Sequence, residues 1–300
     1  MNKFVIKIVL VLFSGALVAQ SNLYPDTLNK KRLATVIATE SVFYVSGISF
    51  LSFWWYKDAQ RVPFQWYNDN EGYLQMDKLG HALTAYKESY FGYYELRKCG
   101  VSKNKALIYG GPLGLILQTP IEIFDGMYEG WGFSKGDMWA NATGSALVVA
   151  QELLWSDQIL KLKMSYQRSK YALISPELLG KNQIQSFLFD YNGHTYWLSA
   201  NINKIIPSNK IPNWLNFAVG YSANGMFGEI ENYRFYGGNF IPEYQRYRQF
   251  LFSLDIDWTK IPTQNKLLKK LFNSMLILKL PFPALEYNPQ NGFVFHALYF

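Results

Sequence analysis

Six polar residues in the first half of the sequence have the types and spacing that acid–base or metal chemistry requires. They form three pairs: Asp77 with His81, Glu122 with Asp125, and Asp137 with Asn141. Residues three or four apart share one face of a helix, so each pair predicts one polar helix face. A histidine surrounded by carboxylates can transfer protons, or can bind a divalent ion that activates water.

The predicted site has an inner and an outer set of residues. The candidate catalytic residues are His81, Asp77, Glu122 and Asp137. His81 would act as acid and base, and the carboxylates would orient it or bind a metal. The wider polar cluster adds Lys78, Asp125, Ser134 and Asn141. His81 is the only histidine in this half, which argues against a zinc site with two or three imidazoles. The alternative is a buried hydrogen-bonded network that fixes helix register without catalysis. The sequence leaves open which hypothesis holds and whether a metal or other cofactor binds.

Ser134 has a simpler interpretation than that of a nucleophile. Gly132–Gly136 has the letters of a nucleophile elbow, but no predicted strand precedes it. We therefore expect the Ser134 hydroxyl to cap the helix that contains Asp137.

Helical patterns surround all three pairs. Helices are predicted at 76–98, at 103–124 with an interruption at Gly110-Gly111-Pro112, and at 136–160, with a loop at 61–72. A further helix at 26–56, capped by Asp26 or Thr27, is apolar nearly all round from 35 to 55. It either packs against other protein or spans a membrane, and Glu40 and Ser41 favour packing. The N-terminal half is therefore predicted to be a bundle of four or five helices with the polar pairs on inner faces.

The pattern changes from helical to alternating after about Lys170. Asn192-Gly193 predicts a tight hairpin turn within 186–201, with positive φ at both residues. Further strands are predicted at 216–222, 248–258, 274–280 and 293–300, and weaker ones at 171–174 and 233–236. These strands have one aromatic face and one polar face, which suits either a small outer-membrane barrel or a soluble β-domain packed on the helices.

Composition and the N-terminus indicate an exported protein. Lys3 and Lys7 precede a short apolar stretch, which predicts a cleaved signal peptide over 1–20. The net charge is +7, but the basic residues are scattered, which argues against nucleic acid as a partner. They are expected either to attract anionic lipid or lipopolysaccharide phosphates or to form an ordinary solvated surface. Tyr, Phe and Trp make up 18% of the chain, which favours association with a membrane. Cys99 is the only cysteine, so no internal disulfide can form.

The ordered pattern D-K-x-x-H, E-x-x-D-G and G-x-S-x-x-D-x-x-A-N-x-x-G, over about residues 70–155, resembles the YfiM-like family of predicted periplasmic proteins and lipoproteins. More distantly it resembles VanZ-type proteins. The resemblance implies a location in the cell envelope and a helical domain, without a settled activity. The chain departs from short members of that family because no cysteine lies near its N-terminus and because about 140 residues follow the motif.

The sequence thus predicts an α+β protein in three parts: a signal peptide (1–20), a helical YfiM-like domain (26–165) and an antiparallel β-domain (170–300). We expect an exported protein of the outer membrane or periplasm, structural or partner-binding, whose partners are the outer membrane, its lipids or other envelope proteins. The alternative is an envelope hydrolase or transferase that acts on a lipid or cell-wall intermediate. The solvent accessibility of His81 should discriminate between the two.

Overall fold

A computed structural model of the chain describes residues 24–50, 52–53, 56–57, 59–206 and 210–300. The predicted signal peptide lies outside these residues. The described chain divides into two compact units. One contains Glu71–Leu79 and Ile159–Phe300, and the other contains the described residues up to Asn70 together with Gly80–Gln158.

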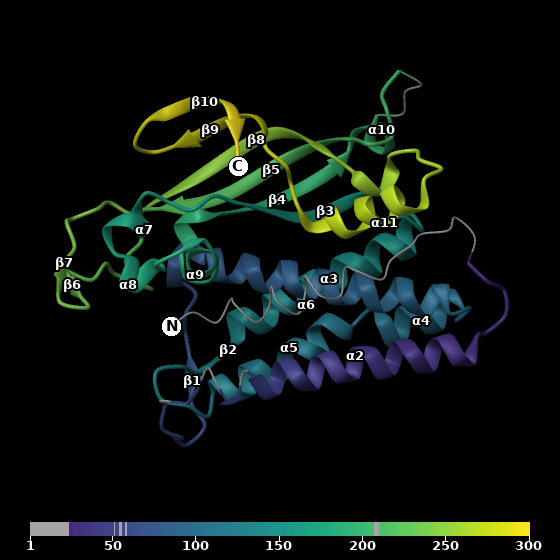
Figure 1. Cartoon of the computed structure of the whole chain (residues 1–300), viewed down its shortest axis with the longest axis horizontal. Helices are drawn as coiled ribbons and strands as arrows, with labels where there is room; N and C mark the ends of the chain where they lie inside the picture. The colour runs from purple at the N-terminus through teal and green to yellow at the C-terminus, as the bar shows by residue number, and fades with distance from the viewer. Residues whose placement is uncertain (1–23, 51, 54–55, 58, 207–209) are drawn as a thin grey trace. The chain divides into compact units, whose positions relative to one another are not determined.

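The helical unit contains the predicted helices (Figure 1). Its elements are α2 (Lys30–Phe50), α3 (Met76–Lys98, whose first turn is counted with the other unit), α4 (Lys103–Gly110), α5 (Leu113–Asp125), α6 (Lys135–Leu154), and the short parallel strands β1 (Trp66–Tyr67) and β2 (Phe133–Ser134). The predicted break between α4 and α5 is confirmed. Asn29, rather than Asp26 or Thr27, caps α2, because its Oδ1 accepts a hydrogen bond from the Arg32 amide.

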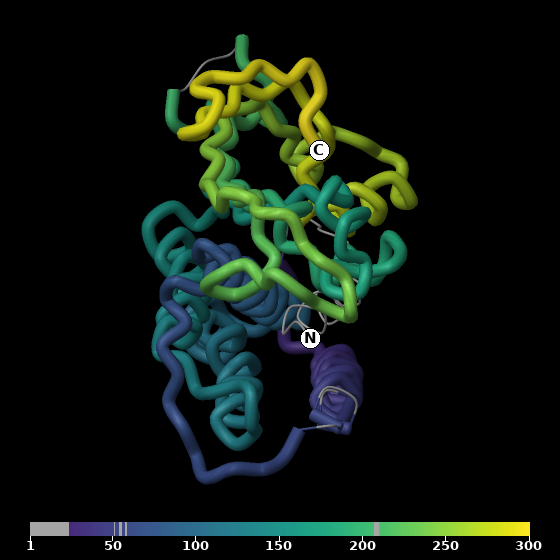
Figure 2. Tube along the Cα trace, turned by 90° about the vertical axis from the view of Figure 1, so that its left-hand side faces the viewer, coloured from purple at the N-terminus to yellow at the C-terminus, as the bar shows by residue number. Residues whose placement is uncertain are grey.

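No residue of helix α2 is fully buried, so the expectation of a helix buried among the others is wrong. One side of it, with Val36, Glu40 and Tyr44, is partly buried. Figure 2, which looks nearly along α2, shows it at the margin of the helical unit. Its Tyr44 hydroxyl donates to the Leu117 carbonyl on α5. Two segments, Lys30–Phe50 and Lys103–Asp125, are long and apolar enough to cross a membrane, a test that the core helix of a soluble protein can also pass.

Small residues allow α3, α5 and α6 to approach closely. A Cβ placed on Gly114 of α5 would lie 2.0 Å from the carbonyl oxygen of Ala85 on α3. A Cβ placed on Gly144 of α6 would lie 2.1 Å from the carbonyl oxygen of Ala82, also on α3. Ser89 donates to Ser145 across the helices at 2.9 Å. Both hydroxyls also accept hydrogen bonds from amides of the first turn of α5. Glycines and hydroxyls at helix contacts are typical of bundles held by close packing and interhelical hydrogen bonds.

The second unit is built on a six-stranded antiparallel sheet in the order β10-β9-β8-β5-β4-β3 (Figure 1). The strands are β3 (Leu160–Tyr166), β4 (His194–Asn201), β5 (Leu215–Asn224), β8 (Tyr247–Ile256), β9 (Phe282–Asn288) and β10 (Gly292–Tyr299). The prediction of an antiparallel sheet is confirmed, whereas the small closed barrel is not found: the described strands form an open sheet.

This unit also contains short elements, of which all but η3 lie between strands of the sheet. They are η3 (Gly72–Gln75), α7 (Tyr171–Ile174), α8 (Pro176–Leu179), α9 (Gln183–Phe189), η4 (Tyr191–Gly193), α10 (Ile202–Ile205), the hairpin of β6 (Phe235–Tyr236) and β7 (Asn239–Phe240), η5 (Trp258–Lys260), α11 (Lys266–Ser274) and η6 (Met275–Ile277). At one edge of the sheet, Leu278 forms a parallel bridge with Met164 of β3, and the Lys279 amide donates to the Met164 carbonyl.

The predicted hairpin over 186–201 is wrong. Residues Gln183–Phe189 are helical, and neither Asn192 nor Gly193 has a positive φ. The Asn192 side chain instead pairs with the backbone of Met226, because its Oδ1 accepts from the Met226 amide and its Nδ2 donates to the Met226 carbonyl. This asparagine therefore lies in the short 3-10 turn η4 and joins two distant segments, and it does not form a hairpin turn.

Other strand predictions differ from the structure at short segments. Segment 171–174 is helix α7, and most of 274–280 belongs to α11 and η6. Segment 233–236 contains only the two-residue strand β6. Strand β9 was not predicted, and β3 begins at Leu160, where the helix at 136–160 was expected to continue.

The burial pattern of the sheet is the reverse of that in a soluble protein. In β8, Gln249, Ser253 and Asp255 are buried, whereas Phe250, Phe252 and Leu254 on the other face are exposed. The buried face is mostly polar with a small apolar centre, Trp197, Ala218, Leu251 and Ala284. The exposed face carries Leu198, Phe217, Val219, Phe250, Phe252, Leu254, Leu285, Tyr287, Phe293 and Phe295.

Candidate functional site

The centre of the predicted site is His81, which has no exposed surface. Its Nδ1 lies 3.2 Å from Oδ1 of Asn141. Its Nε2 lies 3.4 Å from Oδ1 of Asp137 and 3.6 Å from Oε1 of Glu122. The structure therefore brings four of the predicted residues together, and all four side chains are completely buried.

Three helices place these side chains. His81 lies near the start of α3, Glu122 in the last turn of α5, and Asp137 in the first turn of α6 with Asn141 one turn later. The expected role of Ser134 is confirmed, because its Oγ accepts a hydrogen bond from the Asp137 amide and caps α6. A carboxylate in the first turn also interacts favourably with the positive end of the helix dipole.

The hydrogen-bond geometry restricts the proton positions. Oδ1 of Asn141 accepts hydrogen bonds, so Nδ1 of His81 is the donor in this pair. The other ring nitrogen then faces two carboxylates, and a lone pair there would be repelled by them. A proton on Nε2, which makes His81 an imidazolium, would remove this repulsion.

The remaining predicted residues form local contacts of their own. Asp125 accepts a 2.6 Å hydrogen bond from the Tyr56 hydroxyl. Ser134 donates to the buried carboxylate of Asp69 at 2.5 Å. Lys78 Nζ lies 3.8 Å from the Asp77 carboxylate.

Asp77 lies one turn before His81 on α3, and a carboxylate oxygen of Asp77 is within 4.8 Å of a ring nitrogen of His81. The Tyr191 hydroxyl donates to Asp77 at 2.7 Å. Burial, followed by the charge of Asp77, holds the pKa of Tyr191 well above its usual value, so this tyrosine is a hydrogen-bond donor rather than a base.

The sequence did not reveal Tyr56, Asp69 or Tyr191 as partners of the site. Tyr191 lies 114 residues from Asp77 and Tyr56 lies 69 residues from Asp125, so no local spacing could indicate either contact. The loop that contains Asp69 offered only turn-forming residues as a signal.

The donor set around His81 is compatible with a divalent ion. His81 and Asp137 each offer one ligand atom within 4.8 Å of the other, and Asp77 lies on the same helix face as His81. A mixture of one imidazole and several carboxylates suits manganese, iron or zinc better than calcium. The Nε2 of His81 also lies at ion-pair distance from Asp137 and Glu122, so an ion-pair network without a metal is the alternative. Nδ2 of Asn141 is buried without a hydrogen-bond partner among the described residues.

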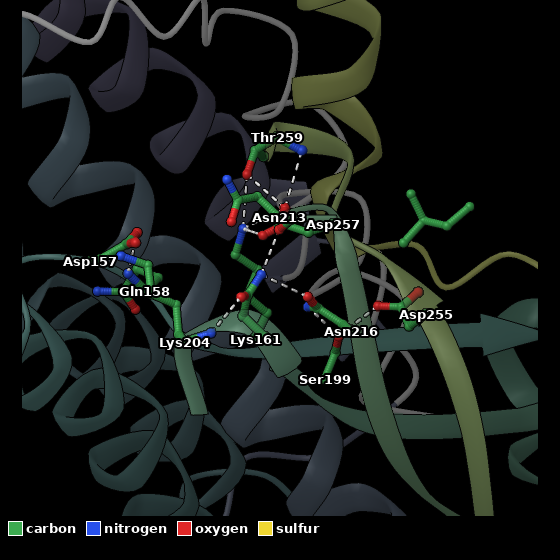
Figure 3. A network of polar contacts seen from close by, with 12 residues as sticks. Asp157, Gln158, Lys161, Ser199, Lys204, Asn213, Asn216, Asp255, Asp257 and Thr259 are labelled. Atoms are coloured by element: carbon green, nitrogen blue, oxygen red, sulfur yellow. Dashed lines mark hydrogen bonds and ion pairs between the residues drawn. The ribbon is translucent and has the colours of Figure 1, made fainter. Parts of the chain in front are cut away.

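A second buried polar set lies on the sheet, and no sequence pattern indicated it (Figure 3). Lys161 Nζ lies 2.6 Å from both carboxylate oxygens of Asp257 and donates to Thr259. Lys163 Nζ lies 2.6 Å from Asp255, which also accepts from Ser199. Burial lowers the pKa of Lys161, and the charge of Asp257 opposes that effect.

Comparison with known families places part of the chain. Residues 65–152 match the model of a family of predicted periplasmic lipoproteins (DUF2279), whose function is unknown. This segment contains every predicted site residue and agrees with an exported protein of the periplasm or outer membrane. The match does not support the more distant VanZ-like link. No curated protein and no solved structure matches the chain.

Proposed function

We propose that this protein is a structural or partner-binding component of the cell envelope that contacts the lipid of the outer membrane through the exposed face of its sheet. The observation that carries the proposal is the reversed burial of β5, β8 and β9. Phe217, Phe252 and Leu285 on these strands are each about 40% exposed, whereas the residues beside them in the chain are buried or belong to the polar face.

Lipid explains this pattern better than water does. Monomeric soluble proteins rarely expose a large contiguous apolar patch. Strands with an apolar band on the outside and polar residues inside are typical of β-structure in outer membranes. Buried polar residues such as Asp255 and Asp257 have ion-pair partners, so the polar face is stable where it is and a reversed orientation is not favoured.

The helical unit supports the same interpretation. Its outer surface carries apolar side chains that are more than half exposed, namely Ile108, Tyr109, Ile116, Trp139, Leu153 and Leu154. Its buried residues include Gln118, Glu122 and Asp137. The helical unit also buries apolar side chains such as Leu83, Tyr86 and Val148, so the support for lipid contact lies in its exposed apolar side chains rather than in a fully polar interior.

The enzyme alternative has less support. A catalytic histidine has to reach its substrate, and His81 has no exposed surface. His81 lies within 3.6 Å of Glu122, Asp137 and Asn141, which come from two other helices, and such contacts are expected of a polar network that fixes helix register.

Single-cysteine spin labelling tests the lipid contact. Cys99 is the only cysteine and is buried, so Cys99→Ser gives a background for new cysteines. Phe252→Cys places a label on the exposed apolar face, and Lys181→Cys places one on an exposed polar surface. In outer membranes, the label at 252 should collide often with oxygen and rarely with a water-soluble nickel complex, and the label at 181 should show the opposite.

Equal collision of both labels with the nickel complex would contradict a lipid-facing sheet. Ser253→Cys is the matched control, because Ser253 adjoins Phe252 and faces the buried side. A label there should be protected from both reagents. Recovery of the intact chain from the soluble periplasmic fraction without detergent would also contradict the proposal.

A further inference from the structure

An apolar cavity of about 330 Å³ lies inside the helical unit, between α2 and helices α3, α4 and α5. Its walls are mainly aliphatic and aromatic: Val36, Phe43, Phe91, Leu96, Leu113 and Leu117. The cavity belongs to neither the His81 cluster nor the sheet. Its size and lining are those of a site for a small apolar molecule or for one chain of a larger amphiphile.

Three carboxylates interrupt the apolar wall. Glu40 comes from α2, and Glu88 and Glu95 come from α3. Glu95 lies 2.9 Å from Lys98 and 3.5 Å from Arg32, and Glu88 accepts a hydrogen bond from Gln118. Glu40 has no cationic or hydrogen-bonding partner among the described residues.

We propose that this cavity binds a lipid that carries an ammonium group on its head, with an acyl chain along the apolar wall and the ammonium at Glu40. Charge complementarity decides the class of ligand. An ammonium would supply the positive charge that Glu40 lacks, and a charge-assisted hydrogen bond between them would form in apolar surroundings. A fatty acid would place its carboxylate beside that of Glu40, for which the described residues provide no cation, and would be repelled.

The ionisation of Glu40 fits this assignment. Burial raises the pKa of Glu40 to about 7, and the charge of Glu95 adds to the increase. The other charged groups near this wall are Glu88 and Lys98 on α3 and Arg32 on α2. A bound ammonium would favour the carboxylate form of Glu40, so the ligand should bind more tightly at pH 8 than at pH 6.

Binding of dodecylamine, dodecanol and dodecanoate to the full chain in one non-ionic detergent tests the proposal. At pH 8, dodecylamine should bind the native protein more tightly than dodecanoate. Glu40→Gln should weaken dodecylamine binding about tenfold, the size of one charge-assisted hydrogen bond, and leave dodecanol binding unchanged. Glu129→Gln, which removes an exposed carboxylate outside the cavity, should change neither.

A variant that fills the cavity separates a specific site from partition into detergent. Ser41 lines the wall, so Ser41→Phe should weaken the binding of dodecylamine and dodecanol together. Equal binding of dodecylamine to native and Glu40→Gln protein would overturn the proposal. Tighter binding of dodecanoate than dodecylamine would overturn it as well. Because the protein is in detergent throughout, these outcomes do not depend on whether its sheet contacts the outer membrane.

Discussion

Replacement of His81 by alanine is the most direct test of what the buried cluster does. His81 contacts Asn141, Asp137 and Glu122, and none of the four side chains is exposed. The change removes one hydrogen bond and the group that faces both carboxylates. Removal of one member of a buried ion pair typically costs about 3–5 kcal/mol, because the remaining charge is left without compensation.

Proton uptake limits this cost and makes it depend on pH. In the His81→Ala variant, a carboxyl group that has lost its cation can bind a proton and become neutral. The folded variant then holds more protons than the unfolded chain, so its stability falls as the pH rises, by up to about 1.4 kcal/mol per unit for one proton. We therefore expect a loss of about 3 kcal/mol at pH 7 and a smaller loss at pH 5.

The assay is thermal unfolding of the detergent-solubilised protein at both pH values. A loss of about 3 kcal/mol corresponds to a fall in melting temperature of roughly 10 °C for a unit of this size. Addition of Glu122→Gln to His81→Ala should restore part of the lost stability, since it removes one of the stranded charges.

An unchanged or higher melting temperature for His81→Ala would refute the structural role. If the same variant also failed to complement a deletion strain, the cluster would be a functional site that trades stability for activity. Additive losses in the double variant would show that His81 and Glu122 are not coupled.

Three further predictions concern groups outside this cluster. Burial lowers the pKa of His194 from its ordinary 6.5 to about 4. The free energy of unfolding should therefore be highest above pH 6.5 and should fall by up to about 3 kcal/mol as the pH falls towards 4. Measurement of unfolding against pH should show this slope in the native protein and not in His194→Gln. Lys161→Met should lower the free energy of unfolding by about 3–5 kcal/mol, because it leaves the buried Asp257 without its ion-pair partner. The double variant with Asp257→Leu should recover most of this stability in denaturant titrations. Gly144→Val should cost about 2 kcal/mol or more in thermal unfolding, because its Cβ would lie 2.1 Å from the Ala82 carbonyl oxygen; an unchanged melting temperature would show that α3 and α6 are not so close.

Features set by neighbouring residues could be predicted from the sequence. Helix α3 follows from spacing along one segment and occupies the predicted range 76–98. The Ser134 cap follows from a residue three positions before Asp137, and strand β8 from alternation between Arg248 and Trp258. The convergence on His81 was expected for the same reason, since amphipathic helices place their polar stripes together.

Features set by distant residues could not be predicted. Asn192-Gly193 has the local chemistry of a turn, but the Asn192 amide is used by the Met226 backbone, which lies 34 residues away. Lys161 and Lys163 look like solvated surface residues until Asp257 and Asp255 are placed opposite them across the sheet. The Tyr191 contact to Asp77 depends on the tertiary fold in the same way.

The two edges of the six-stranded sheet differ in a way that limits how copies of this chain could associate. The outer edge of β3 is already bonded to Leu278 and Lys279, whereas β10 has a strand partner on one side only among the described residues. A sheet with two open edges can add copies without end, as fibrils do. A sheet with one open edge can join only one other sheet, edge to edge, and the resulting pair has no edge left to extend. The bridge at Met164 obstructs the middle of the β3 edge, so β10 is the edge through which a second copy would pair more easily.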